Sequence, residues 1–341
     1  MIGLIANLIR WEWFKLSRRW MPWILLIILL LFSQLSIWGG YFSYRSMANS
    51  GGRIMMGFEG QGERPVTISC NDLLGGNVPE GLSSEEAALF SQQCQKQAAQ
   101  NQQQLQDSYA TITLPGGVVN ALHISEQIGL ILIAILAASL IGTDFAWGTM
   151  RTVLVKGTGR WQYLASKLVL LVLLAGGAFL LVAAAATLSS AIVGGLTKAG
   201  PDGAAVYSWM DVATAFGKAW FALLPYVALA ACITMLTSST AAGMAVALAY
   251  NFLETIVSVI LFSLFDWFGT VADYLVGRNI TAWMASGREQ GVREVLGGVT
   301  GLGNFPGALH AFLVMVVYIV VLGGLAFWIL RRRDITGGSA G

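Results

Sequence analysis

Long apolar runs recur along the chain and are separated by polar segments. A helix needs about 20 mostly apolar residues to cross the hydrocarbon core of a bilayer. Six stretches meet this length, namely residues 20–44, 122–143, 164–195, 219–237, 241–265 and 308–330. A short polar turn around Ser238 separates the fourth stretch from the fifth, so we expect a tight helical hairpin there. The pattern predicts an all-α membrane protein with six transmembrane helices.

The segments outside the six spans predict further elements. In residues 1–19, Ile5, Ile9 and Leu16 recur at helical spacing, which predicts a helix lying along the membrane interface. The alternative is a basic flank that only orients the first span. The other segments are a large outer loop or small domain (45–121), a short inner loop (144–163), a second outer loop (196–218), outer re-entrant or amphipathic helices (266–307) and an inner tail (331–341).

Within the large outer loop, the two halves differ in composition. The first half is rich in glycine and is predicted to be irregular, whereas a glutamine-rich helix is predicted toward Tyr109. Cys70 and Cys94 share this loop on the oxidising side of the membrane, so we expect a disulfide between them. Cys232 falls within the fourth span and is interpreted as a packing residue.

Composition agrees with a membrane protein and excludes several other classes. Of the 341 residues, 56% are hydrophobic and 11% are charged, and the mean hydropathy is +0.67. Soluble domains carry about 25% charged residues, so a water-soluble enzyme is excluded. There is no basic stripe for nucleic acid. The chain has two histidines and three cysteines, and we expect no metal site and no cofactor on this chain.

The distribution of charge predicts the orientation. With the N-terminus inside, the inner segments, together with Lys167 at the inner start of the third span, hold eleven of the 20 Lys and Arg residues but only three of the 18 acids. Positively charged residues concentrate on the cytoplasmic side of membrane proteins. We therefore expect both termini in the cytoplasm, and we expect the membrane to be the plasma membrane of a bacterium.

The fifth span contains an amide and a carboxylate side chain. Asn251 and Glu254 lie near its middle, where a carboxylate costs at least a few kcal/mol unless it is paired or protonated. Glu254 is either functional, as a substrate contact, a proton-linked site or a hydrogen bond across a dimer, or it is a structural partner of a nearby polar group. The sequence leaves both interpretations open.

The inner loop between the second and third spans carries a spaced series of polar and glycine residues. Its sequence, GTDFAWGTMRTVLVKGTGRWQYLASKLV, is longer and more patterned than a passive connection requires. A short amphipathic helix there would suit docking into a groove on a cytosolic partner. The residues of the series and of this helix are Asp144, Gly148, Thr149, Met150, Arg151, Leu154, Arg160 and Lys167.

This loop resembles that of the permease subunits of type-2 ABC transporters. Those proteins place an acidic residue four positions before Gly-Thr, as Asp144 is here, then a basic residue, and then an Arg and a Lys that enter the third span. Many of them have a proline shortly before that Arg, where this chain has Gly157-Thr158-Gly159. The resemblance extends to the layout of an interfacial helix, six spans and outer re-entrant helices.

The resemblance implies a function and its partners. The loop 144–163 would be a coupling helix that binds a cytosolic ATPase subunit carrying ATP and Mg²⁺. A second permease copy, identical or related, would complete the assembly. This chain has no G-x-x-x-x-G-K-[ST] motif, so we expect it to be the non-catalytic subunit. The expected function is ATP-driven export of a hydrophobic or amphipathic drug, peptide or lipid. The alternative is a stand-alone secondary transporter or channel.

Overall fold

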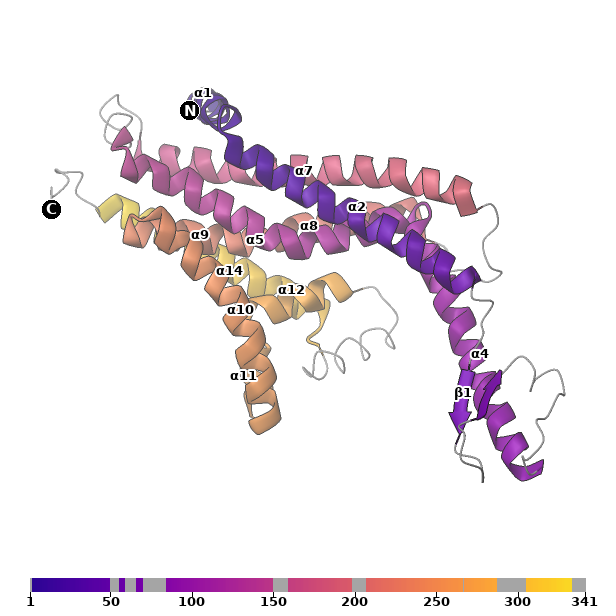
Figure 1. Cartoon of the computed structure of the whole chain (residues 1–341). Helices are drawn as coiled ribbons and strands as arrows, with labels where there is room; N and C mark the ends of the chain where they lie inside the picture. Colours follow the sequence, from indigo (N-terminus) through magenta and orange to yellow (C-terminus); the bar gives the residue numbers. More distant parts are fainter. Residues whose placement is uncertain are drawn as a thin grey trace. The chain divides into compact units, whose positions relative to one another are not determined.

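The described residues of this computed structural model are mainly helical (Figure 1). They are residues 2–49, 55–58, 66–69, 84–149, 159–197, 207–265, 267–286 and 305–332. Six helical segments in these ranges are long and apolar enough to cross a membrane, which confirms the prediction of a helical, multi-pass membrane protein at this level. They are α2 (Trp20–Asn49), α5 (Gly116–Ala146), α7 (Arg160–Thr197), α8 with α9 (Trp209–Thr237), α10 within Thr240–Ser258, and α14 (Ala308–Arg332).

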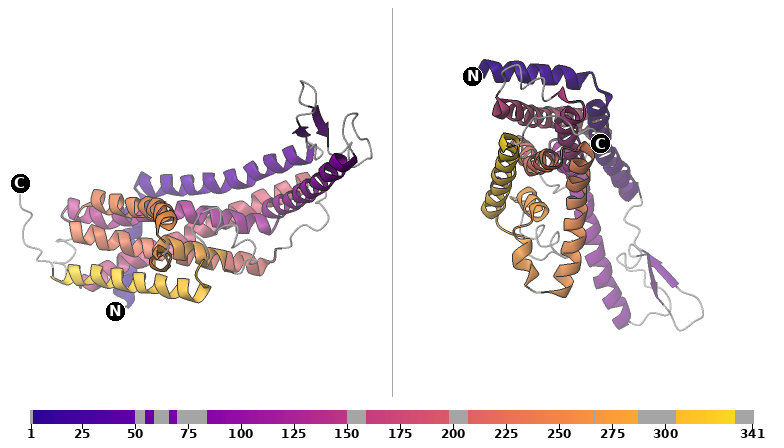
Figure 2. Two further views of the ribbon diagram at one scale, coloured as in Figure 1. Left: turned by 90° about the horizontal axis from the view of Figure 1, so that it is seen from below. Right: turned by 90° about the vertical axis from the view of Figure 1, so that its left-hand side faces the viewer.

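A separate helix, α1 (Ile2–Ser17), precedes the first of these segments. Figure 2 shows α1 turned across the direction of α2. The chain breaks between them at Arg18 and Arg19, where the indole N–H of Trp23 donates to the Ser17 carbonyl at 2.9 Å. This bond satisfies one of the carbonyls that the end of α1 leaves without a helical partner.

The fourth spanning segment consists of two helices. α8 (Trp209–Ala222) ends beside Leu223, and α9 (Leu224–Thr237) begins there with Pro225 in its first turn. Proline has no amide hydrogen, so it can begin a helix but interrupts one that has already formed. α8 also begins ten residues before the predicted start of this span. Ser208 and Asp211 exchange hydrogen bonds at its N-terminus, as in a capping box.

The turn between α9 and α10 (Thr240–Leu264) consists of Ser238 and Ser239. Ser238 has φ 56°, and the Ser239 hydroxyl accepts from the Ala242 amide at 3.3 Å. α5 packs closely against this turn at Gly142, where an added Cβ would lie 2.7 Å from the Cα of Thr240. Glycine at this position therefore allows a close helix contact, as small residues do in membrane bundles.

Among the described residues, α11, α12 and α14 follow α10 along the chain. α11 (Phe268–Ala272) and α12 (Val276–Ala285) lie where short outer helices are predicted. α9 packs against α10 and α14, with α14 running beside it (Figures 1 and 2). α12 packs against α14 and α10. A buried cluster joins α5, α7, α9 and α14 and includes Ile141, Tyr163, Leu164, Met235 and Leu330.

By internal contacts the chain forms two compact units. The first comprises Met1–Ser33, Leu122–Ala183 and Ala213–Gly341, and it contains the helix contacts described above. The second comprises Gln34–Ala121 and Ala184–Val212. In the second unit, Tyr44 of α2 packs on Tyr109 of α4 (Ser84–Ile112), with ring centroids 5.7 Å apart.

The glycine-rich half of the outer loop, predicted to be irregular, contains a short antiparallel pair of strands. β1 (Met55–Phe58) pairs with β2 (Val66–Ser69), with Met55 opposite Ser69. Each strand has only four residues, too few for an alternating pattern to stand out from the surrounding glycines. The β-branched residues of β2, Val66, Thr67 and Ile68, favour a strand.

Candidate functional site

A buried ionic network centres on Lys167, near the start of α7. The ammonium lies 2.8 Å from Asp144 Oδ2, 3.0 Å from Glu12 Oε2 and 3.0 Å from the Leu140 carbonyl oxygen. An ammonium group has three hydrogens to donate, and these three acceptors match them. We call Glu12, Lys15, Asp144, Thr149, Tyr163 and Lys167 the Lys167 network.

The carboxylates of this network are also satisfied. Asp144 accepts from the Tyr163 hydroxyl at 2.5 Å and from the Thr149 hydroxyl at 2.9 Å. Glu12 accepts from Lys15 at 3.1 Å. The carboxylates of Glu12 and Asp144 and the ammonium groups of Lys15 and Lys167 together have a formal charge of zero. A buried charge is tolerated when it is both paired and hydrogen-bonded, as it is here.

The network connects three helices at the ends of the predicted coupling loop. Glu12 comes from α1, Asp144 from the last turn of α5, and Lys167 from α7. Lys167 is fully buried, and Glu12 and Asp144 are 6% and 4% exposed. Because Asp144 is the first residue of the loop 144–163 and Tyr163 is the last, the network holds the two ends of the loop together and attaches both to α1.

α5 is followed by Gly148, one of the residues of the predicted loop motif. Gly148 has φ 65°, the left-handed conformation that glycine adopts without a Cβ penalty at helix ends. Thr149 then turns back to Asp144, five residues earlier. Met150, Arg151 and Leu154 lie outside the described residues, so their role in docking stays a prediction.

Arg160 has a different partner from Lys167. Its Nη1 donates to the carbonyl of Arg331 at 2.7 Å, at the C-terminal end of α14. A cation there satisfies a free carbonyl and interacts favourably with the helix dipole. The start of α7 is therefore attached to α14 as well as to α1 and α5.

The structure thus brings Asp144, Thr149 and Lys167 together and places Arg160 apart from them. Sequence reasoning did not single out Glu12 or Tyr163. A signal for Glu12 was present, because it shares the helical face of Ile5, Ile9 and Leu16, and an acid on the apolar face of a helix requires a buried partner. Tyr163 lies one turn before Lys167, but its bond to Asp144 depends on how α5 and α7 pack.

Glu254, the other candidate, binds the N-terminus of a helix. Its Oε1 accepts from the backbone amide of Arg278 at 3.0 Å and also interacts with the amide of Gly277. These amides belong to the first turn of α12, whose own N-cap residue, Leu275, has no side-chain acceptor. The first amides of a helix have no partner within it, and a carboxylate near them is favourable.

Tyr250, one turn before Glu254, completes this cap. Its hydroxyl oxygen accepts from the Val276 amide at 3.4 Å. A Cβ on Gly277 would lie 2.8 Å from Glu254 Oε1, so glycine permits the close approach. Asn251 has a separate partner, because its side-chain amide donates to the hydroxyl of Tyr226 on α9 at 2.9 Å. Asn251 and Glu254 therefore do not form one site.

The cysteines and histidines add no further cluster among the described residues. Cys94 is disulfide-bonded, and Cys232 carries a free thiol. Cys70 lies outside the described residues, so its pairing with Cys94 stays a prediction. His310 Nε2 lies 2.9 Å from the Asp273 carbonyl oxygen. In the part of the chain that the structure describes, no three His, Cys, Asp or Glu residues are grouped to hold a metal ion.

Comparison with known proteins gives one match. Residues 92–336 match the family model described as "Protein of unknown function (DUF2705)". The chain belongs to this family. The match to DUF2705 includes Asp144, Lys167 and Glu254, and it begins after α1, which supplies Glu12. No curated protein and no solved structure matches the chain.

Proposed function

We propose that the chain is the membrane-spanning permease subunit of an ATP-driven ABC exporter. In this proposal the segment 144–163 binds a separate cytosolic ATPase subunit, which carries the ATP and Mg²⁺. A second permease copy completes the assembly, and the exported substrate is hydrophobic or amphipathic. The protein is located in the bacterial plasma membrane, with both termini in the cytoplasm.

The Lys167 network is the observation that carries this proposal. A subunit driven by a partner needs a rigid connection between the docking segment and the spanning helices. The network supplies such a connection, because buried ion pairs hold the two ends of the segment to each other and to α1. The Arg160 bond to Arg331 extends the connection to α14. Movement of the docking segment would thereby reach α1, α5, α7 and α14 together.

The resemblance of the loop motif to type-2 ABC permeases supports the same conclusion. Asp144, Thr149 and Lys167, which the motif singles out, are joined in one network. In the proposed mechanism, closure of two ATPase subunits around ATP displaces the docking segments, and the spans change from an inward-open to an outward-open arrangement.

Co-purification tests the proposal directly. The tagged full-length chain is purified from the membranes of its own host in mild detergent, and bound proteins are identified by mass spectrometry. We expect an ATPase with a G-x-x-x-x-G-K-[ST] motif to co-purify. The double variant Met150→Asp with Leu154→Asp should lose most of it, because charges would replace the apolar face that docks.

A matched double variant controls for a general effect of added charge. Gln102→Asp with Gln103→Asp introduces the same two charges at exposed positions of α4 and should retain the ATPase. Retention of the ATPase by the Met150 and Leu154 variant would refute the docking assignment. Absence of any ATPase from the wild-type complex would refute the ABC proposal and favour a stand-alone transporter or channel.

A further inference from the structure

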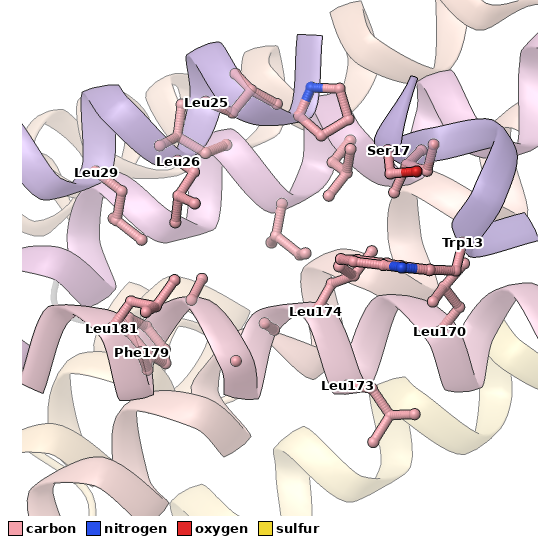
Figure 3. Close-up of a pocket in the computed structure, with 18 of the residues that line it drawn as sticks. Trp13, Ser17, Leu25, Leu26, Leu29, Leu170, Leu173, Leu174, Phe179 and Leu181 are labelled. Atoms are coloured by element: carbon pink, nitrogen blue, oxygen red, sulfur yellow. The ribbon is translucent and has the colours of Figure 1, made fainter. Parts of the chain in front are cut away.

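A cavity of about 600 Å³ lies in the first unit between α1, α2, α5 and α7. Its walls are nearly all apolar. Figure 3 shows Leu26 and Leu29 of α2 on one side of the space, and Leu170, Leu174 and Phe179 of α7 on the other. Cavities of about 300–1,000 Å³ are typical of sites for small ligands.

The cavity opens toward the membrane-facing surface of the helices. Leu173 and Leu181, which line it, are 56% and 50% exposed. Both lie within α7, a candidate spanning helix, so an opening at this surface meets hydrocarbon when α7 crosses a membrane. Water does not fill apolar cavities readily, and an empty space of this size would cost stability. The occupant is therefore apolar where it meets these walls.

One end of the cavity is lined by a basic side chain and two tryptophans rather than by aliphatic side chains. Arg10 and Trp13 of α1, together with Trp23 at the start of α2, line that end. Tryptophan and basic side chains are the residues that meet lipid headgroups at the membrane interface. Glu12, the single acid of α1, is bound to Lys15 and Lys167 and does not offset Arg10. Among the described residues no carboxylate forms an ion pair with Arg10.

The charge at one end of the cavity favours a lipid over a helix of a second copy. An apolar spanning helix offers no anion to Arg10, whereas the headgroup of an anionic lipid does. The acyl chain of such a lipid is thin and flexible enough to enter between α2 and α7.

We infer that this cavity binds an anionic phospholipid from the leaflet next to α1. An acyl chain occupies the space between α2 and α7, and the headgroup phosphate lies at Arg10. Trp13 and Trp23 contact the region where the headgroup joins the chain. The bound lipid thus fills the gap between α1–α2 and α7, next to the helices that carry Glu12 and Lys167. This inference goes beyond the proposed transport function and does not depend on an ATPase.

Photocrosslinking of lipid to the purified full-length chain in nanodiscs tests the inference. The probe is phosphatidylglycerol with a diazirine on one acyl chain, and phosphatidylcholine with the same chain is the neutral comparison. We expect adducts concentrated in peptides covering residues 129–136 and 170–181, with more from the anionic probe. Arg10→Gln should reduce the preference for the anionic probe by about fivefold.

A cavity-filling variant separates this site from ordinary lipid contact. Gly177 lines the cavity, and a Cβ there would meet nothing within 4 Å, so Gly177→Phe adds an aromatic ring to this wall from an unobstructed Cβ. Gly324→Phe on α14 is the matched control, because its Cβ is equally free and it does not line the cavity. We expect Gly177→Phe to lose most of the adducts in these peptides and Gly324→Phe to retain them.

Two results would overturn the inference. Adducts spread evenly over all lipid-facing helices and unchanged in Gly177→Phe would mean that the cavity holds no lipid. A photoreactive residue at Leu173 that yields a crosslinked protein dimer in place of a lipid adduct would mean that a second copy covers this opening. Neither readout requires transport or an ATPase, so failure here is distinguishable from failure of the proposed function.

Discussion

At the scale of single residues, the contacts of Lys167 explain how a charged group is stable inside a bundle of helices. The three hydrogens of its ammonium have three acceptors, and two of these are carboxylates that are themselves satisfied. Removing one member of such a network leaves the others buried without a counter-charge. This loss is larger than the net contribution of the intact ion pair.

Replacing Lys167 should therefore destabilise the protein far more than replacing Lys15, although both contact Glu12. Lys167→Met leaves Glu12 and Asp144 buried, and we expect a loss of about 3–5 kcal/mol in the free energy of unfolding. Lys15 is 37% exposed, so Lys15→Met should cost about 1 kcal/mol or less. Denaturant unfolding in detergent measures both. Equal losses for the two variants would contradict the structural importance of the network.

At the scale of elements, α12 depends on side chains from another helix for its N-terminal cap. Glu254 and Tyr250 of α10 accept from the amides at the start of α12, whose own Leu275 offers no acceptor. The carboxylate within the fifth predicted span therefore has a structural partner, but this partner is the backbone of a short helix rather than a basic side chain.

Removing the Glu254 carboxylate should loosen the first turn of α12. For Glu254→Ala we expect hydrogen exchange of the Gly277 and Arg278 amides to rise by about tenfold, since a cap contributes roughly 0.5–2 kcal/mol. Glu254→Gln keeps an acceptor oxygen and should cause a smaller rise. Ser239→Ala, which removes the cap of α10, should affect the Ala242 amide and leave α12 unchanged. Unaltered exchange in Glu254→Ala would show that this cap does not hold α12.

At the scale of the whole molecule, the proposed orientation in the membrane rests on the distribution of charge. The part of the chain proposed to lie inside holds eleven basic residues against three acids, whereas the whole chain has 20 against 18. Moving basic segments across the membrane is disfavoured, and this asymmetry determines how the spans insert. The network and the docking segment are on the cytoplasmic side only if this orientation is correct.

Reporter fusions test that orientation. Green fluorescent protein fused after Gly341 should fluoresce, and alkaline phosphatase inserted in the segment 45–121 should be active, because it folds only outside the cytoplasm. We expect the exchanged fusions, phosphatase at the C-terminus and fluorescent protein in that segment, to be inactive. The opposite pattern would place the loop 144–163 outside and exclude its binding to a cytosolic ATPase.

The sequence alone was enough to predict the long helices, and it singled out three of the residues that meet at the ends of the inner loop. Length and hydrophobicity predict spans such as α7 because a bilayer requires an apolar helix of a minimum length. The spacing of Asp144, Thr149 and Lys167 was recognisable as a motif. Pro225, which has no amide hydrogen, lies just after the interruption of the fourth span at Leu223.

Only the tertiary structure decided which residues meet. Glu12 and Lys167 are 155 residues apart in sequence, and Glu254 binds amides that become available only where α12 begins. Hydrophobic patterning reports the length of a helix and the face that it buries, but it does not report which helix lies opposite. The pairing of buried charges and the cavity between α2 and α7 both depend on that choice of neighbours, so they follow from packing and not from the local pattern.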